Sequence, residues 1–256
     1  NPYLGIMLPY TPLHHLLHGE LGFPVVATSG NLSGEPICTD EFDALDRLRD
    51  IADFFLVHDR PIARPVDDSV VRVMMGRALI LRRARGYAPL PIEISTPLPA
   101  VLAVGGHLKN TVALSSGNSI VLSQPTGDLD TALAAQALEK TVADLNGLYA
   151  ATPCVVACDA HPDYYSSQLA SGLGLPLIAV QHHYAHVLSC MADNGLDEPV
   201  LGVAWDGTGL GTDGTLWGGE FLRVTAAGLE RAAHMRTFML PGADQRSISS
   251  IALSKC

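Results

Sequence analysis

The chain has 256 residues, of which 48% are hydrophobic and 16% are charged, and its formal net charge is −10 at pH 7. This composition excludes a disordered chain and indicates a globular protein with a sizeable core, while the acidic balance argues against broad, charge-driven binding to nucleic acid. The five cysteines form no paired CxxC motif and no apolar run reaches the ~20 residues that cross a bilayer, so we expect a cytoplasmic protein without membrane spans or a disulfide framework.

The first predicted block covers residues 1–91. In chain order, its expected elements are a helix at 12–21, a buried strand at 23–31, a helix at 39–53 and two strands within 67–89. The second helix has apolar residues at helical spacing behind a candidate N-cap, Thr39 or Asp40. The block is followed by a stretch with four prolines in eleven residues, PLPIEISTPLP, and we expect a linker at 92–99.

The second predicted block starts at Ala100. Its expected elements are strands at 101–106, 110–116 and 119–124, a helix at 130–151, a strand at 154–160, a helix at 166–174, a strand at 176–180, a helix at 182–195, and two strands around a Gly-rich turn within 200–224. This order, βββαβαβα followed by a β-hairpin, predicts an α/β fold whose first strands are antiparallel.

Three of the ten histidines fall within VQHHYAHVLS, residues 180–189. His182 and His186 are four residues apart, so on a helix they share one face and can hold one metal ion, whereas His183 points elsewhere. Imidazole suits zinc or iron, and a third ligand, a carboxylate, has to come from another part of the chain. Ordinary surface or core histidines are the alternative, but ligands of open α/β sheets bind beyond the carboxyl ends of strands, where these histidines are expected.

The stretch WDGTGLGTDGTLWGGE places Asp206 where a predicted strand meets a Gly-rich turn. Glycines let backbone N–H groups approach a phosphate, so Gly207, Thr208 and Gly209 are candidates for a nucleotide site, with Asp206 as a metal ligand or catalytic group. The alternative is a plain hairpin with Asp-Gly turns.

Three further pairs of polar residues could contact a nucleotide: Ser29 with Asn31, Arg82 with Arg83, and Lys109 with Asn110. The first pair flanks a glycine after a predicted strand, the arginines could clamp phosphates, and the last pair lies at a predicted hairpin tip. Each pair also fits ordinary loop or edge chemistry.

The ordered set TSGNLSGEP, RRARGY, LKNT, QPTGDLD, DAHPDY, QHHYAH and DGTGLGTDGTLWGGE resembles the HypF family, the carbamoyltransferases of [NiFe]-hydrogenase maturation. By that resemblance, residues 1–91 are the C-terminal part of a YrdC-like adenylate-forming domain, an RNA-binding fold. Residues 100–244 are the first lobe of an actin-like (ribonuclease H-like) ATPase domain, and residues 245–256 form an atypical tail. The opening at Asn1 and this tail lead us to expect a fragment at both ends.

The resemblance implies a chemistry in three stages. Carbamoyl phosphate is hydrolysed, the carbamate is joined to AMP from ATP, and the carbamoyl group passes to the C-terminal cysteine of the partner HypE. His182, His186 and Asp206 are then the catalytic metal site, with iron or zinc as the metal and magnesium accompanying the nucleotide. Ser29 and Asn31 belong to the adenylate site. The family's second lobe supplies a further metal ligand, so the chain alone is not expected to complete a turnover.

Other functions remain open at this point. A related O-carbamoyltransferase would use the same carbamoyl-adenylate, and an enzyme of tRNA threonylcarbamoylation would share both domains. A non-catalytic remnant that binds nucleotide without turnover is the alternative from another class.

Overall fold

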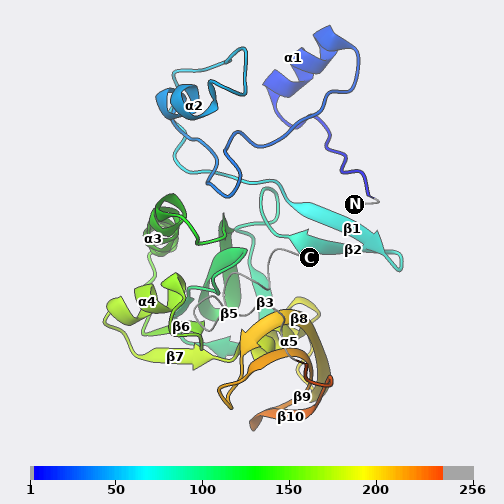
Figure 1. The fold of residues 1–256 in the computed structure, drawn as a ribbon, viewed down its shortest axis with the longest axis vertical. Helices are drawn as coiled ribbons and strands as arrows, with labels where there is room; N and C mark the ends of the chain where they lie inside the picture. The colour runs from blue at the N-terminus through cyan, green and yellow to red at the C-terminus, as the bar shows by residue number, and fades with distance from the viewer. Residues whose placement is uncertain (1–2, 239–256) are drawn as a thin grey trace. The chain divides into compact units, whose positions relative to one another are not determined.

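The structure is a computed structural model that describes residues 3–238 (Figure 1). Contacts divide the chain into two compact units, Asn1–Gly30 and Asn31–Cys256, which are described separately. The predicted tail at 245–256 lies outside the described residues. Among the helices that the structure describes, none combines the length and the apolar character needed to traverse a bilayer.

The first unit contains helix α1 (Pro12–Leu21), which confirms the predicted helix. It begins where the Thr11 hydroxyl accepts a hydrogen bond from the His14 N–H, and it ends at Gly22, whose φ of 67° is left-handed. The strand predicted at 23–31 is wrong, because residues 23–28 form no strand and Val26 is fully exposed. A strand needs a hydrogen-bonded neighbour, and the described part of this unit offers none.

The first helix of the second unit is α2 (Glu41–Leu48). The Asp40 carboxylate caps it by accepting hydrogen bonds from the N–H groups of Phe42 and Asp43. Strands β1 (Val70–Met74) and β2 (Arg77–Arg82) then form an antiparallel hairpin. The turn between them has left-handed backbone at Gly76, as a tight hairpin turn requires. The helix and both strands were predicted.

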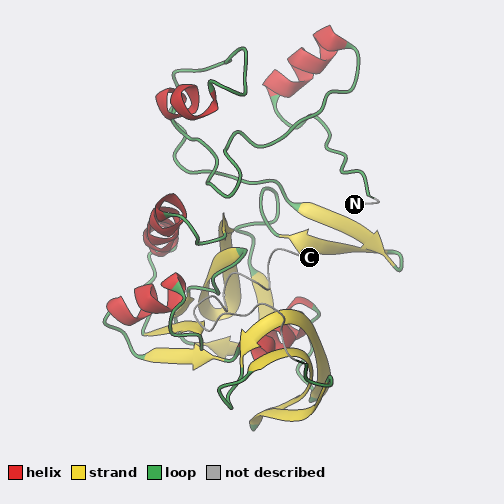
Figure 2. Cartoon of the chain, in the orientation of Figure 1, coloured by secondary structure: helices red, strands yellow, loops and turns green. Residues whose placement is uncertain are grey.

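The largest sheet that the structure describes has five strands and belongs to this unit (Figure 2). Its strand order is β3-β5-β4-β6-β7, with bounds β3 (Ile92–Leu98), β4 (Val101–Ala103), β5 (Asn110–Gly127), β6 (Val155–Asp159) and β7 (Leu177–Val180). Strands β4, β6 and β7 are parallel, while β3 and β4 each pair with β5 in antiparallel fashion. The expected α/β sheet with antiparallel first strands is confirmed.

Two details of this sheet bear on the sequence analysis. The Pro-rich segment 92–99, predicted as a linker, contributes the edge strand β3 instead. Proline removes a backbone donor, and an edge strand tolerates that loss. Element β5 reverses at its middle: the Val112 N–H donates to Ser123 Oγ at 3.0 Å, although eleven extended residues would span ~35 Å. Gly117, with a φ of 60°, makes the turn, as predicted for SSGNS.

Helices α3 (Ala132–Leu148) and α4 (Tyr165–Gly172) cover one face of the sheet. They enclose a core of apolar side chains from the helices and strands. This core includes Leu102, Val104, Val112, Leu114, Val121, Leu138, Val142, Leu145, Val156 and Ala170. Both helices were predicted, and this core holds the carboxyl ends of β4 and β6 in place.

Helix α5 (His182–Asp193) packs against a second sheet rather than the first core. This sheet has the order β10-β9-β8, formed by β8 (Val200–Leu210), β9 (Leu216–Thr225) and β10 (Gly228–His234). The predicted hairpin at 200–224 is β8 with β9. Its turn lies at 211–215, after Leu210, and not directly behind Asp206 as expected, because β8 resumes its pairing with β9 at Gly209.

Candidate metal centre

Three parallel strands end at one edge of the five-stranded sheet, and residues that line one cavity lie at or just after each end. Gly105 and Gly106 follow β4, Asp159 closes β6, and His182 opens α5 directly after β7. Helix α5 begins there because the Gln181 side chain caps it, accepting the Tyr184 N–H at 2.9 Å. The histidines were expected at the end of a strand, and they lie there, because β7 ends at Val180 and α5 begins at His182.

Asp206 reaches this edge from the second sheet. Residues 206–208 stand opposite the single residue Gly218 in β9, so β8 bulges there. A bulge re-aims a side chain, and the Asp206 carboxylate points toward the start of α5. Gly209 lets the helix approach, since a Cβ at this position would lie 2.8 Å from the Cβ of His182.

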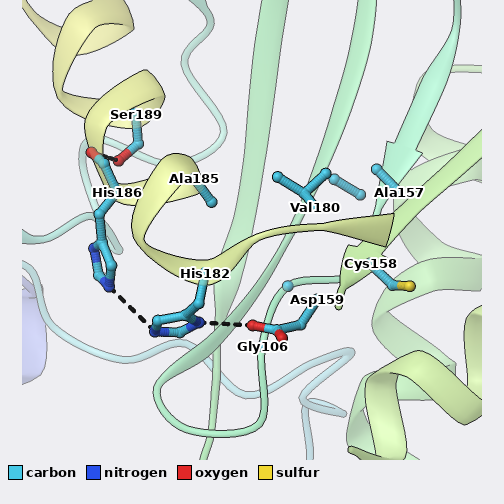
Figure 3. Close-up of a pocket in the computed structure, with 11 residues that line it drawn as sticks. Gly106, Ala157, Cys158, Asp159, Val180, His182, Ala185, His186 and Ser189 are labelled. Atoms are coloured by element: carbon cyan, nitrogen blue, oxygen red, sulfur yellow. Dashed lines mark hydrogen bonds and ion pairs between the residues drawn. The ribbon is translucent and has the colours of Figure 1, made fainter. Parts of the chain in front are cut away.

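The side chains of His182, His186 and Asp206 converge. Figure 3 shows the two histidines of this group next to each other, with His182 also facing Asp159. Asp206 Oδ2 lies 3.0 Å from His182 Nε2 and 3.4 Å from His186 Nε2, and the two imidazole nitrogens are 3.3 Å apart. All three donor atoms thus fall within 4.8 Å of one another. Two imidazoles with one carboxylate and an open side is a donor set that suits catalytic zinc or non-haem iron, so the residues present fit such a metal.

Charges within the cluster reinforce one another. The Asp159 carboxylate, and then that of Asp206, raise the pKa of His182 to about 9. Burial alone would raise the pKa of Asp206, but hydrogen bonds from His182, His186 and the Gly207 N–H hold it well below its usual value. Burial lowers the pKa of His183, which is fully enclosed. At neutral pH the metal-free cluster is therefore an ionised carboxylate beside a protonated His182.

This charge state predicts that metal binding strengthens with pH. Because a metal ion takes the place of the His182 proton, one proton is released per ion while the pH lies below the His182 pKa of about 9. We expect the zinc affinity to rise roughly tenfold per pH unit between pH 7 and 9 and then to level off. Competition with a chelator at several pH values measures this slope, and a flat profile would contradict it.

A cavity of about 290 Å³ opens beside the cluster, between the sheet edge and α5 (Figure 3). Its walls are largely small apolar side chains, including Ala103, Ala157 and Val180, while His182 and Asp159 stand at its polar side. The candidate metal centre therefore adjoins a space that can hold a small group.

Comparisons with known proteins match almost every part of the chain. Family models match at residues 96–193 (HypF Kae1-like domain), at 202–254 (carbamoyltransferase, Kae1-like domain, second subdomain) and at 1–84 (Sua5/YciO/YrdC, described as telomere recombination). A relative from Synechocystis sp. named carbamoyltransferase HypF is 56% identical over 96% of this chain and 32% of its own length.

The chain belongs to the HypF family. A second relative, carbamoyltransferase HypF2 of Cupriavidus necator, is 44% identical over 95% of the chain and 33% of its own length. The chain thus spans about a third of the length of the curated relatives it matches.

Two solved HypF structures share the fold. The crystal structure of full-length HypF in the phosphate- and nucleotide-bound form has a TM-score of 0.85 and 48% identity, covering 89% of this chain and 36% of that one. The T. kodakarensis HypF structure has a TM-score of 0.87 and 38% identity, covering 95% and 33%. The α/β fold with a YrdC-like part and an actin-like part was predicted, and the matches to YrdC-like and Kae1-like domains confirm it. The boundaries proposed at 91, 99 and 244 stay predictions.

The remaining residues predicted from the HypF resemblance lie outside the metal cluster. Ser29 is exposed on a loop of the first unit. In the second unit, the Asn31 side-chain amide donates to the backbone carbonyls of Leu32 and Glu35, at 2.8 and 3.0 Å. Both of these hydrogen bonds lie within its own loop. A nucleotide role for either residue remains a prediction.

The two arginines are held by acidic neighbours. Arg82 pairs with Asp67 at 2.8 Å, and Arg83 lies 3.9 Å from Asp193 at the end of α5. Their guanidinium groups would have to leave or share these partners to clamp a phosphate. On the second sheet, Gly207 donates its N–H to Asp206, and neither Gly207 nor Gly209 has left-handed backbone, so the expected anion nest is not formed there.

Asn110, predicted at a hairpin tip, is instead buried. Its amide nitrogen donates to the carbonyls of Val104 and Gly106, both at 2.7 Å, and thereby ties the loop after β4 to β5. Its neighbour Lys109 is exposed and has a left-handed φ of 48°.

We expect Asn110→Ala to lower the free energy of unfolding by about 1–3 kcal/mol, because a buried carbonyl and a partly buried one lose their donor. Urea unfolding measures the loss, and Lys109→Ala, which changes an exposed side chain of the same loop, is the matched control. Unchanged stability in Asn110→Ala would contradict this structural role.

Sequence reasoning missed Asp159, which contacts His182 directly. A usable signal existed, since Asp159 closes a buried strand and opens the motif DAHPDY. The parallel pairing of β6 with β7 places its carboxylate beside the start of α5. Gln181 was missed as well, although a polar residue directly before a helical pattern is a recognisable cap signal.

Proposed function

We propose that this chain is the portion of a HypF carbamoyltransferase that carries the metal-dependent carbamoyl-transfer centre. The proposal rests on one observation: two histidines of α5 and Asp206 of β8 bring three metal-binding atoms within 4.8 Å of one another. Family membership gives this centre its chemistry, since the relatives are named carbamoyltransferases.

The proposed reaction has an activation and a transfer step. In the first, a carbamate oxygen attacks the α-phosphorus of ATP, and pyrophosphate leaves as carbamoyl-adenylate forms; carbamoyl phosphate is the source of the carbamate. In the second, the thiolate of the C-terminal cysteine of HypE attacks the carbonyl carbon, and AMP leaves with the electrons of the broken C–O bond. The product is a thiocarbamate on HypE, destined for hydrogenase maturation.

Each residue of the centre has a defined task in this scheme. His182 and His186 would hold an iron or zinc ion through Nε2, and Asp206 would hold it through Oδ2. The bound ion would supply positive charge where negative charge builds up on the phosphate and carbonyl oxygens. The cavity beside His182 would exclude bulk water from the reacting carbonyl, because its walls are apolar.

The nucleotide contacts are proposed from the positions of the candidate residues. Gly207, Thr208 and Gly209 lie next to Asp206 in β8, and Lys109 is exposed on the loop between β4 and β5, so both places can meet the nucleotide of the transfer step. In the YrdC-like portion, Ser29, Asn31, Arg82 and Arg83 would belong to the activation step, with magnesium accompanying ATP. Asn110 would act indirectly, by holding the loop that carries Lys109.

The test is transfer of the carbamoyl group itself. Since this chain alone is not expected to complete a turnover, a protein that joins it to the remaining portions of a HypF carbamoyltransferase is incubated with ATP, ¹⁴C-carbamoyl phosphate and HypE, with and without added iron or zinc. Label on the HypE cysteine is then counted. We expect metal-dependent labelling that is lost in Asp206→Asn. Saturable nucleotide binding without labelling would instead support a nucleotide-binding protein without turnover.

A further inference from the structure

Asp159 is fixed from three directions at the edge of the sheet. Its backbone carbonyl accepts the Ser167 hydroxyl at 3.0 Å, and its Oδ1 accepts the His161 N–H at 2.8 Å. Its Oδ2 lies 2.6 Å from His182 Nδ1. With only 5% of its side chain exposed, the carboxylate cannot turn away to solvent.

This arrangement sets which nitrogen of His182 is free for a metal. An ionised carboxylate only accepts hydrogen bonds, so Nδ1 must carry the proton that it donates to Asp159. The lone pair of the neutral ring is then on Nε2, which faces Asp206 at 3.0 Å and His186 at 3.3 Å. A carboxylate behind a metal-binding imidazole also raises its basicity.

We propose that Asp159 is a positioning residue of the metal centre, which locks His182 in the tautomer and orientation that direct Nε2 to the metal. This inference rests on the metal centre proposed above and adds a residue that does not itself touch the ion. The two histidines are then unequal: among the described residues no hydrogen-bond partner is found for His186 Nδ1, and its side chain is 54% exposed. His182 is the anchored ligand and His186 the adaptable one.

The fixed His161 N–H makes the Asp159→Asn variant informative. That N–H requires an oxygen opposite it, so the new amide directs its carbonyl to His161 and its NH₂ group to His182. An NH₂ group donates, so His182 Nδ1 must accept, and the ring proton moves to Nε2, facing the metal. Asp159→Ala merely frees the ring to adopt either tautomer.

The expected order of zinc affinity is therefore wild type, then Asp159→Ala, then Asp159→Asn. Loss of such a partner weakens metal binding about 10- to 100-fold, and we expect the isosteric Asn variant to lose more than the Ala variant. A merely structural role predicts the reverse, since Asn keeps the shape and the hydrogen bonds. Asp130→Asn, which changes the exposed partner of His107 in a histidine–carboxylate pair of 2.9 Å, is the matched control and should bind zinc like the wild type.

Affinity is measured by chelator competition with zinc alone, and ¹⁵N NMR of the imidazoles gives a readout independent of affinity. In the zinc-loaded wild type, we expect His182 to carry its proton on Nδ1 and zinc on Nε2; in Asp159→Asn without zinc, we expect the proton on Nε2. Zinc on Nδ1, or an Asn variant that binds better than the Ala variant, overturns the inference while the metal centre stands. A wild-type protein that binds no zinc or iron overturns the proposed metal centre and the role of Asp159 with it.

Discussion

His182→Ala is expected to weaken zinc or iron binding by more than about 100-fold, since removing even a partner behind a ligand costs up to that much. His182 contacts both Asp159 and Asp206, at 2.6 and 3.0 Å. Its loss therefore removes one metal ligand and also the contact between the cluster and Asp159 of β6. His186→Ala should cost less, because His186 is half exposed and lies farther from Asp206, at 3.4 Å. Metal content after dialysis and chelator competition measure both losses.

The control for this comparison is His234→Ala, which removes an exposed histidine of β10 and should leave metal binding unchanged. Equal losses in His182→Ala and His186→Ala would contradict the unequal roles assigned to them. A His182→Ala protein that retains its metal would remove α5 from the metal centre altogether.

Gly209→Ala is expected to damage both stability and metal binding. A Cβ at this position would lie 2.8 Å from His182 Cβ and 2.8 Å from His183 Cε1, and His183 is fully buried, so α5 has to move away from β8. Overpacking of this kind costs about 1–3 kcal/mol of unfolding free energy. Metal ligands tolerate displacements of only about 0.2 Å, so the zinc affinity should fall with it.

Gly207→Ala is the matched control for this variant. It lies two residues earlier in the same strand, and a Cβ there would meet nothing within 4 Å. Thermal unfolding and zinc competition are measured on both variants. They distinguish damage caused by contact with α5 from damage that any side chain in this part of β8 would cause. If Gly207→Ala were as harmful as Gly209→Ala, contact with α5 would not be the reason for glycine at 209.

Elements with a local signal could be predicted from the sequence. Helices α1 and α2 begin at capping residues, Thr11 and Asp40, and the turns at Gly76 and Gly117 are where left-handed backbone was needed. The pair His182 and His186 belongs to the same class of prediction, because a spacing of four places two side chains on one helical face whatever surrounds the helix. These features depend on a few neighbouring residues only.

Elements that depend on a distant partner were the ones predicted wrongly. Residues 23–28 have the composition of a strand but form none, since no neighbouring strand satisfies their backbone in the described part of their unit. The prolines of 92–99 indicated a linker, yet β5 offers an edge on which the segment pairs. Asn110 was assigned to a polar hairpin tip, but its side chain is buried and donates a hydrogen bond to the Val104 carbonyl.

The family resemblance, the order of most strands and helices, and the two histidines that share one face of α5 all follow from the amino-acid sequence alone. The folded chain was needed to show that Asp206 meets these histidines across a bulge in β8, and that Asp159, at the end of β6, lies behind His182. Spacing along the chain fixes which residues share a face of one element. Which elements come together is set by sheet pairing and core packing between segments far apart in the chain, and that information is spread over residues that carry no chemistry of their own.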